Sequence, residues 1–407
     1  MPLSPHRRTA PARRGRDADV LIVGAGCAGL SLAWHLVERG LTGRRVLLVD
    51  PREGYGSDRT WCGWSVVAHP FDADVSHRWR RWRVRAPTGS WILRQAPGLH
   101  YHRLPSDAFY RRVLARLEPH PDVELRLGVG VSQVRPGLDH VEVETSAGVL
   151  RADLVFDSRP PDLPPEAEAG ERVTLLQHFE GWTVRTERDA FDPSTVTLMD
   201  FAMPQDRGIH FLYVLPFGPR HALVEPTWFG TDRLAPEDYR GALVDAVEGR
   251  LGIRGYTVVD REAGSIPMTT RSFDRQPHPR LVRIGLAGGL AKPSTGYAFQ
   301  RIQSDSATLA ERLLAGGLPS APEPRPRRAA FQDRVFLSYL ARAPRQAPDA
   351  LVDLFRYVPP TTLARFLSDI ATLPEVLRVM RHMPPVALTL ETLRSVPIWL
   401  RPRVALA

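Results

Sequence analysis

The most regular pattern of apolar and polar positions lies near the N-terminus, between residues 19 and 50. An apolar run at 20–23 leads directly into three glycines with G-x-G-x-x-G spacing, and apolar residues then recur at helical spacing up to Arg39. A second apolar run, 46–49, ends in Asp50. A strand, a glycine turn, a helix, a strand and an acid in this order predict the first unit of a dinucleotide-binding fold.

The glycines and the acid each have a chemical reason in such a unit. Gly24 permits the tight turn, Gly26 lets the backbone approach a pyrophosphate, and Gly29 lets the helix lie close to the sheet. Asp50 would accept hydrogen bonds from a ribose. These four residues predict a dinucleotide site, and a position so early in a long chain favours FAD over NAD. The alternative is a tight strand-to-helix turn that binds nothing.

The pattern downstream alternates between short strand-like runs and helices. Short strands are expected over 123–157, the last of them returning to the first sheet, and aromatic strand-like runs follow over 174–225. A helix over 235–251 and a strand over 256–263 complete this second region. Another strand, glycine turn and long helix follow over 282–316, as in flavoproteins that close two dinucleotide folds over the isoalloxazine ring.

We therefore predict an α/β protein with a Rossmann-like FAD-binding domain of the two-dinucleotide-fold flavoprotein type, an inserted mixed β-sheet substrate domain and a C-terminal helical region. Apolar faces of that helical region either dock on the core or lie in a lipid interface. The predicted parts are a disordered basic tail (1–16), a discontinuous FAD-binding domain (17–160 plus 275–318), a substrate-binding sheet domain (161–274) and the helical region (329–407).

Charge and composition narrow the classes of function. The net charge is +9, but Lys292 is the only lysine and the arginines are spread through the chain, so we predict no nucleic-acid partner. A basic balance equally suits an anionic membrane surface. The two cysteines, Cys27 and Cys62, form neither a metal spacing nor a disulfide framework, which favours a reducing compartment. We expect no metal site and no membrane-spanning helix, since no run of about eighteen apolar residues occurs.

A family resemblance extends from about residue 19 to the C-terminal helices. It is carried by the segments GAGCAGL, DRTWCGW, FEGWTVRT, LMDF, FLYVLPF, VEPTW, GSIPM and GGLAKPSTGYAF. In these the chain resembles the bacterial and plant lycopene cyclases, the FAD-containing enzymes that close rings on the ends of carotenes. The resemblance implies carotenoid biosynthesis, lycopene or a related acyclic carotene as substrate, and reduced FAD with NAD(P)H as the electron source. It also assigns Gly288, Thr295 and Gly296, in the late glycine turn, to the cofactor.

The implied chemistry is cyclisation without net redox change. A proton is added to C2 of a ψ end group, the C1 cation is captured by the C5–C6 double bond, and the C5 cation loses a proton from C6. Such a reaction needs an acid in a dry apolar cavity. Glu225, which follows an apolar run and precedes Trp228 and Phe229, is the predicted acid or base, and Asp200 in LMDF is the second candidate. The alternative for each is an acid at the solvent-facing end of a strand.

Plant members carry a Glu-Glu pair where this chain has Glu225 and Pro226, which puts a paired-carboxylate mechanism in doubt. Lys292 beside the late turn is a weaker candidate to face flavin or phosphate. Aromatic residues predicted to line a polyene tunnel, with core packing as the alternative, are Trp61, Trp64, Trp182, Phe211, Tyr213, Trp228 and Tyr297.

Two other classes of function share the predicted fold. One is an FAD-dependent monooxygenase or prenyl reductase, whose Asp-Gly and Gly-Asp pairs are replaced here by Asp157-Ser158 and Gly285-Leu286. The other is a lipid or prenyl carrier that has lost the cofactor, against which the intact glycine motif and Asp50 argue. A water-insoluble carotene implies membrane contact, so we predict a cytoplasmic protein with peripheral membrane association and no protein partner.

Overall fold

The first sheet surrounds the N-terminal glycine turn. The computed structural model describes residues 15–160, 173–324 and 326–400, so most of the predicted basic tail and the proline-rich linker after residue 160 lie outside it. The sheet has the order β8-β2-β1-β11-β10-β9, with β17 beside β11. Its strands are β1 (Ala18–Val23), β2 (Val46–Asp50), β8 (Val123–Leu127), β9 (Val131–Pro136), β10 (Val141–Thr145), β11 (Gly148–Asp157) and β17 (Leu281–Arg283).

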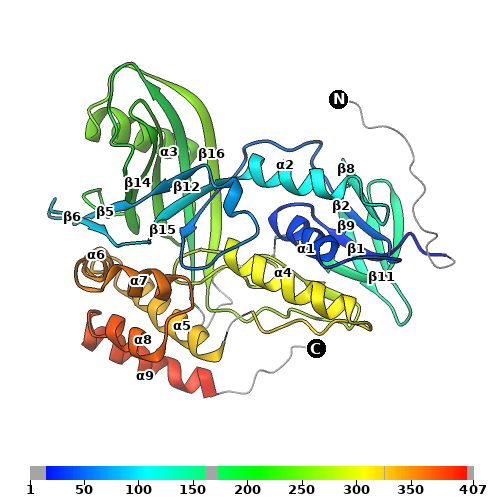
Figure 1. Ribbon diagram of the computed structural model, residues 1–407. Helices are drawn as coiled ribbons and strands as arrows, with labels where there is room; N and C mark the ends of the chain where they lie inside the picture. Colours follow the sequence, from blue (N-terminus) through cyan, green and yellow to red (C-terminus); the bar gives the residue numbers. More distant parts are fainter. Residues whose placement is uncertain (1–14, 161–172, 325, 401–407) are drawn as a thin grey trace.

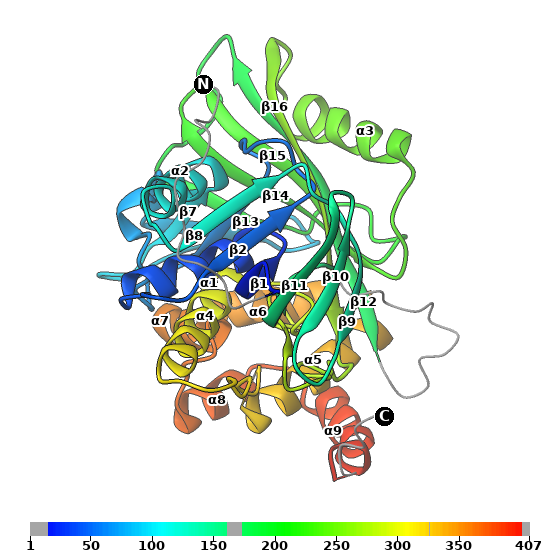
Figure 2. The same ribbon diagram turned by 90° about the vertical axis from the view of Figure 1, so that its right-hand side faces the viewer.

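Parallel pairing makes this sheet a dinucleotide-binding fold. β1 runs parallel to β2 and β11, and β17 runs parallel to β11, whereas β9, β10 and β11 form an antiparallel meander. Helices α1 (Cys27–Glu38) and α4 (Phe299–Leu314) lie side by side on one face, with α2 (Ser106–Leu117) next to α1 (Figures 1 and 2). Apolar side chains of all three helices share one core with the strands. The predicted Rossmann-like architecture is confirmed.

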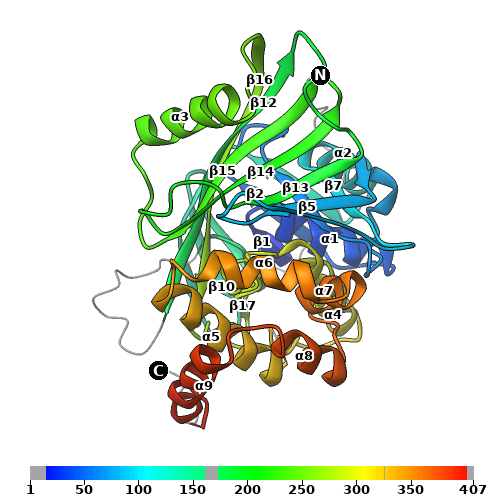
Figure 3. The same cartoon turned by 90° about the vertical axis from the view of Figure 1, so that its left-hand side faces the viewer.

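The second sheet is mixed and strongly aromatic. Its order is β16-β12-β15-β14-β13-β5-β6, antiparallel except for the β13–β5 pair. Helix α3 (Pro236–Val244) and a π-helical turn at Asp245–Arg250 cover its outer face (Figures 1 and 3). Its strands are β5 (Arg81–Arg85), β6 (Trp91–Gln95), β12 (Thr174–Thr186), β13 (Thr195–Asp200), β14 (Ile209–Gly218), β15 (His221–Gly230) and β16 (Tyr256–Thr269).

Three details of this region differ from the sequence-based expectation. The helix expected over 235–251 changes to π-helical geometry at Asp245. The strand expected over 256–263 continues through 264–269 as β16, because this segment pairs residue by residue with β12. β5 and β6, within the range expected in the FAD-binding domain, extend the second sheet. They are joined to the first sheet through a small third sheet of β3 (Thr60–Trp64), β7 (Tyr101–Pro105) and β4 (His77–Trp79).

The C-terminal helices pack under the inner face of the second sheet. Side chains of α5 (Arg327–Arg342), α6 (Ala347–Tyr357) and α7 (Pro360–Leu367) belong to the same core as β5, β14 and β15. Helices α8 (Leu373–Met380) and α9 (Pro385–Leu400) form the outer layer (Figures 1 and 3). Of the two expected uses of the apolar faces, docking on the core is therefore confirmed for α5 to α7. Within the described ranges, no helix has the length and apolar character needed to cross a membrane.

Candidate active site

The early glycine turn has the geometry that the motif predicts. Gly24 has a φ of +90°, and a Cβ there would lie 2.2 Å from Ser158 Oγ. A Cβ on Gly29 would lie 1.9 Å from the carbonyl oxygen of Gly24, so only glycine lets α1 approach the turn this closely. Gly26 precedes α1 without a side-chain cap, and with the following two residues it faces a large cavity. The N-terminal N–H groups of α1 are thus directed where a pyrophosphate would bind.

Asp50 is tied to this turn. Its Oδ2 accepts a hydrogen bond from the amide of Ala25 at 2.7 Å, and its Oδ1 accepts from the amide and Nε of Arg52 at 2.9 and 3.0 Å. Arg52 rather than Asp50 contributes to the cavity wall. The carboxylate therefore holds the turn in place, and its contact with a ribose stays a prediction.

The late glycine turn meets the early one. Gly285, with a φ of +62°, lies so near α1 that a Cβ there would be 2.8 Å from the Cβ of Ala28. Thr295 and Gly296, which were predicted to contact the cofactor, line the same cavity. Gly288 does not: a Cβ there would lie 2.6 Å from the carbonyl oxygen of Arg283, so this glycine serves the packing of the turn itself. Of Gly285 and Gly288, it is Gly285 that lies next to the cavity.

One cavity of about 720 Å³ connects both glycine turns to the second sheet and the C-terminal helices. Its walls beyond the turns are mainly apolar, which excludes water from polar groups that face it. Residues from the sheets and helices that line it include Trp61, Cys62, Tyr101, Phe179, Phe211, Tyr213, Phe229, Tyr297, Phe336, Phe355 and Phe366.

Glu225 faces this cavity from the middle of β15. Side chains alternate along a strand, so Glu225, Thr227 and Phe229 line the cavity while Val224 and Trp228 point to the outer face. The Glu225 side chain is buried, with 6% of the residue exposed, and the hydroxyl of Thr227 donates to its Oε1 at 3.2 Å. Burial raises its pKa well above the usual range, and the neighbouring carboxyl of Glu262 raises it further. A buried acid that keeps its proton is what alkene protonation requires.

Glu262 was not predicted. It lies on β16 and lines the same cavity, and its carboxyl group interacts with that of Glu225 across β12, where Gly181 leaves room between them. The signal that could have found it was strand alternation in the segment REAGSIPM, which continues beyond the end of the strand expected over 256–263.

Asp200 lies elsewhere. It is buried at the end of β13, where its carboxylate is 3.5 Å from Arg85 Nη1 and 3.7 Å from Arg250 Nη2, and it accepts from the amide of Ala202 at 3.0 Å. The structure does not bring it to the cavity wall. Its ion pairs account for its burial, so the structure gives no support to Asp200 as a catalytic acid.

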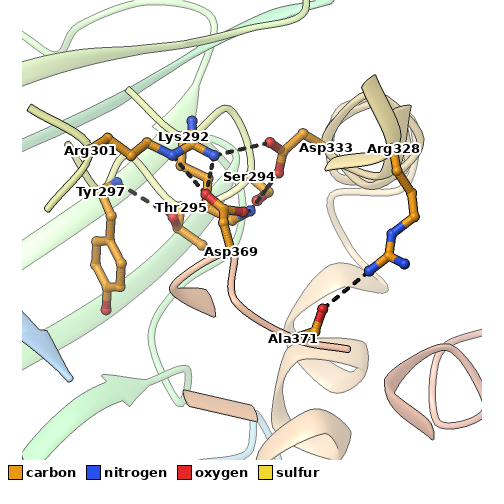
Figure 4. A network of polar contacts seen from close by, with 9 residues as sticks. All are labelled: Lys292, Ser294, Thr295, Tyr297, Arg301, Arg328, Asp333, Asp369 and Ala371. Atoms are coloured by element: carbon orange, nitrogen blue, oxygen red, sulfur yellow. Dashed lines mark hydrogen bonds and ion pairs between the residues drawn. The ribbon is translucent and has the colours of Figure 1, made fainter. Parts of the chain in front are cut away.

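Lys292 is part of a buried ion-pair network and is not directed to the cavity between the glycine turns. Its Nζ contacts Asp369 and lies 3.0 Å from Asp333 Oδ1, and Arg301 contacts the same two carboxylates (Figure 4). The hydroxyl of Ser294 donates to Asp333 at 2.6 Å. The network ties the late turn and α4 to α5 and to the loop after α7. It accounts for the burial of Lys292, whose contact with flavin or phosphate stays a prediction.

Some of the aromatic residues predicted to line a polyene tunnel do line the cavity, while the binding of a polyene there stays a prediction. Trp61, Phe211, Tyr213 and Tyr297 line the cavity. The other three do not: Trp64 is in the core against Trp82 and Tyr101, Trp182 packs under α3, and Trp228 stacks on His210 with ring centroids 4.0 Å apart. For Trp182 and Trp228 the reason is alternation, which directs them to the outer face of the sheet. In the described residues, no group of three or more His, Cys, Asp or Glu side chains is placed to hold a metal ion.

Solved structures with a similar fold include a protein in a complex with FAD. A geranylgeranyl bacteriochlorophyll reductase-like protein from Thermoplasma acidophilum has a TM-score of 0.65 at 15% identity, over 91% of this chain and 98% of that one. Aklavinone-11 hydroxylase in a complex with FAD and aklavinone has a TM-score of 0.55 at 17% identity, over 88% of this chain and 72% of that one. At these identities the likeness concerns the fold.

Relatives found by sequence indicate a narrower class of protein than the structural neighbours do. The chain is 25% identical over 389 residues to the lycopene beta-cyclase of Pantoea ananas, covering 90% of this chain and 95% of that protein. It is 26% identical over 396 residues to the lycopene beta-cyclase of Paracoccus sp. (strain N81106 / MBIC 01143), covering 91% and 95%. A family model described as lycopene cyclase protein matches residues 19–393, nearly the whole chain. The protein therefore belongs to the lycopene cyclase family.

Proposed function

We propose that this protein is a lycopene β-cyclase, which converts ψ end groups of lycopene or a related acyclic carotene to β rings in carotenoid biosynthesis. Family membership supports this class of reaction. The observation that carries the proposal is the position of Glu225, a buried acid with a raised pKa that faces an apolar cavity reaching both glycine turns.

FAD is the cofactor we propose for the glycine-turn end of the cavity. A Cβ at Gly26 would project towards Arg52 Nη2, at 3.7 Å, and the uncapped start of α1 and the backbone around Thr295 and Gly296 face the same space. Glycine there leaves the backbone accessible to a pyrophosphate, so the residues present fit such a group. When bound in its reduced anionic form, FAD supplies negative charge that stabilises a nearby carbocation. The reduced state, and NAD(P)H as the source of electrons, are parts of this proposal.

The chain's own residues then have distinct tasks. Glu225 gives its proton to C2 of the end group, and the walls formed by Phe211, Tyr213 and Phe229 exclude water that would capture a cation. Aromatic faces also attract positive charge, which suits a cation moving from C1 to C5. Loss of the C6 proton completes the β ring and leaves no net redox change.

The outer helices supply a surface suited to a lipid-dissolved substrate. Leu377 is 61% exposed on α8, and Leu390 and Leu393 are 47% and 64% exposed on α9. Arginines such as Arg378 and Arg394 lie on the same helices, and α8 directly follows the cavity-lining α7. Exposed leucines bordered by arginine fit an anionic bilayer surface. We propose peripheral association with the cytoplasmic face of a membrane through α8 and α9.

Pigment chromatography of lycopene-accumulating cells that express the chain tests the function. The wild type should yield cyclic carotenes, Glu225→Gln should yield none at equal protein level, and Glu237→Gln, an exposed acid on α3, should match the wild type. Lycopene left untouched by a yellow wild-type protein that oxidises NADPH with another substrate would replace the cyclase by a monooxygenase or prenyl reductase.

A further inference from the structure

Two carboxyl groups meet over a single glycine in the second sheet. Glu225 on β15 and Glu262 on β16 are separated by β12, so their backbones are about 10 Å apart, twice the spacing of neighbouring strands. Between them lies Gly181, the register partner of Glu262. A Cβ on Gly181 would lie 3.2 Å from Glu225 Oε2 and 3.2 Å from Glu262 Cγ. Because there is no side chain at this position, the two acids approach each other over β12 and their carboxyl groups interact.

A hydrogen bond between two carboxyl groups requires one proton, and the surroundings decide which group holds it. Glu225 is fully enclosed, whereas Glu262 is half-buried and its Oε2 accepts a hydrogen bond from the Thr60 hydroxyl at 2.8 Å. Burial disfavours charge on Glu225. The pair therefore holds its proton on Glu225 and its negative charge on Glu262.

The other titratable groups beside Glu225 are uncharged. Tyr213 on β14 is the register partner of Glu225, and Cys62 on β3 is hydrogen-bonded to Tyr213. Both are uncharged at neutral pH, because burial raises their pKa values. The charged groups that line the same cavity are Arg52, Asp58 and Arg59.

We propose that Glu262 is a positioning residue for the acid Glu225: the two share one proton, and the negative charge of Glu262 keeps that proton on Glu225 until an end group is bound. The inference rests on the proposed cyclase function. When the O–H bond of Glu225 breaks and a C2–H bond forms, two carboxylates are left side by side. Their repulsion favours return of one proton to the pair as the C6–H bond breaks and its electrons form the C5–C6 double bond. Each turnover thus restores the pair without another reactant.

Glu262 answers the doubt about a paired-carboxylate mechanism, which arose because Pro226 stands where plant members have a second glutamate. The second carboxylate of the site comes from another strand, so its supply does not depend on the residue that follows Glu225. Gly181 in the segment FEGWTVRT and Glu262 just before GSIPM are the sequence features that make the pair.

The test combines pH–rate profiles with infrared titration of full-length protein. Cyclisation of lycopene in anionic phospholipid vesicles is followed with reduced FAD supplied, for the wild type, Glu262→Gln and Asp260→Asn. Asp260 is an exposed acid on the same strand. Glu262→Gln should move the alkaline limb of the profile down by about one pH unit or more, and lower the rate above that limb about tenfold, because Glu225 loses its proton more readily without the neighbouring charge. Asp260→Asn should leave the limb in place.

Infrared spectra follow the protonated carboxyl band of Glu225, assigned by its loss in Glu225→Gln, and need no substrate. The band should titrate at lower pH in Glu262→Gln and in Gly181→Ala, whose methyl group separates the acids. Unchanged titration and an unchanged alkaline limb in Glu262→Gln would refute the shared proton. A wild type that shows the coupled titration but never cyclises lycopene would uphold the pair and overturn the proposed function.

Discussion

Replacing Lys292 by methionine should weaken the attachment of the C-terminal helices. Two cations, Lys292 and Arg301, balance two carboxylates, Asp333 and Asp369, and Lys292 is only 4% exposed (Figure 4). Methionine fills a similar volume but removes one positive charge, which leaves an uncompensated carboxylate in a buried site. Breaking a buried ion pair in this way costs about 3–5 kcal/mol.

The loss of stability in Lys292→Met should be largest where the ion-pair network joins separate helices. Lys292 and Arg301 belong to the late turn and α4, whereas Asp333 is on α5 and Asp369 follows α7. Hydrogen–deuterium exchange should therefore accelerate first in α5 and in the segment after α7, before the first sheet is affected. Urea unfolding of the same variant gives the overall change in the free energy of unfolding.

A double variant that restores charge balance is the control for Lys292→Met. Lys292→Met combined with Asp369→Asn restores charge balance, and asparagine tolerates the φ of +62° at this position. The double variant should recover part of the lost stability and slow the exchange in α5. A Lys292→Met protein within about 0.5 kcal/mol of the wild type, or a double variant less stable than the single one, would refute the reasoning that charge balance holds these helices.

Three further outcomes are expected. Gly29→Ala places a methyl group against a turn carbonyl and should purify without yellow flavin colour, whereas Gly241→Ala, in open space on α3, should stay yellow. Leu377→Asp should lower sedimentation with anionic liposomes, and Val259→Asp, an exposed position on β16, should not. Burial lowers the pKa of His210 from 6.5 to about 4, so its contribution to stability is complete above pH 6.5 and is lost as pH falls towards 4; urea midpoints should follow this course and flatten in His210→Asn.

The part of the site that sequence could predict is local in the chain. The glycine turn could be found because its spacing, its flanking strands and the acid after β2 lie within about thirty residues, the span of one strand–helix–strand unit. Glu225 could be found because it interrupts an apolar run. In both cases the chemical requirement and the element that meets it are neighbours in sequence.

The parts of the site that sequence could not predict depend on pairing between strands that lie far apart in the chain. Glu262 becomes significant only once β16 is aligned with β12 and Gly181 is seen to leave a gap. Sequence could not tell Gly285 from Gly288 for a related reason. Several glycines lie close together in this turn, and only backbone geometry shows that Gly285, and not Gly288, faces the cavity. Trp228 shows the opposite case: counting alternate residues from Glu225 would have placed it on the outer face.

The cavity has walls contributed by residues from Gly26 to Leu367, and this affects the order in which the enzyme can be made. On the ribosome, the glycine turn and the aromatic strands emerge long before α7. Until α5, α6 and α7 have been made, side chains such as Phe211 and Phe229 have no covering helices, so the nascent chain exposes an apolar surface to chaperones and membranes. A chain released before residue 360 would carry both carboxyl groups of the pair and still lack a closed compartment in which a carbocation survives.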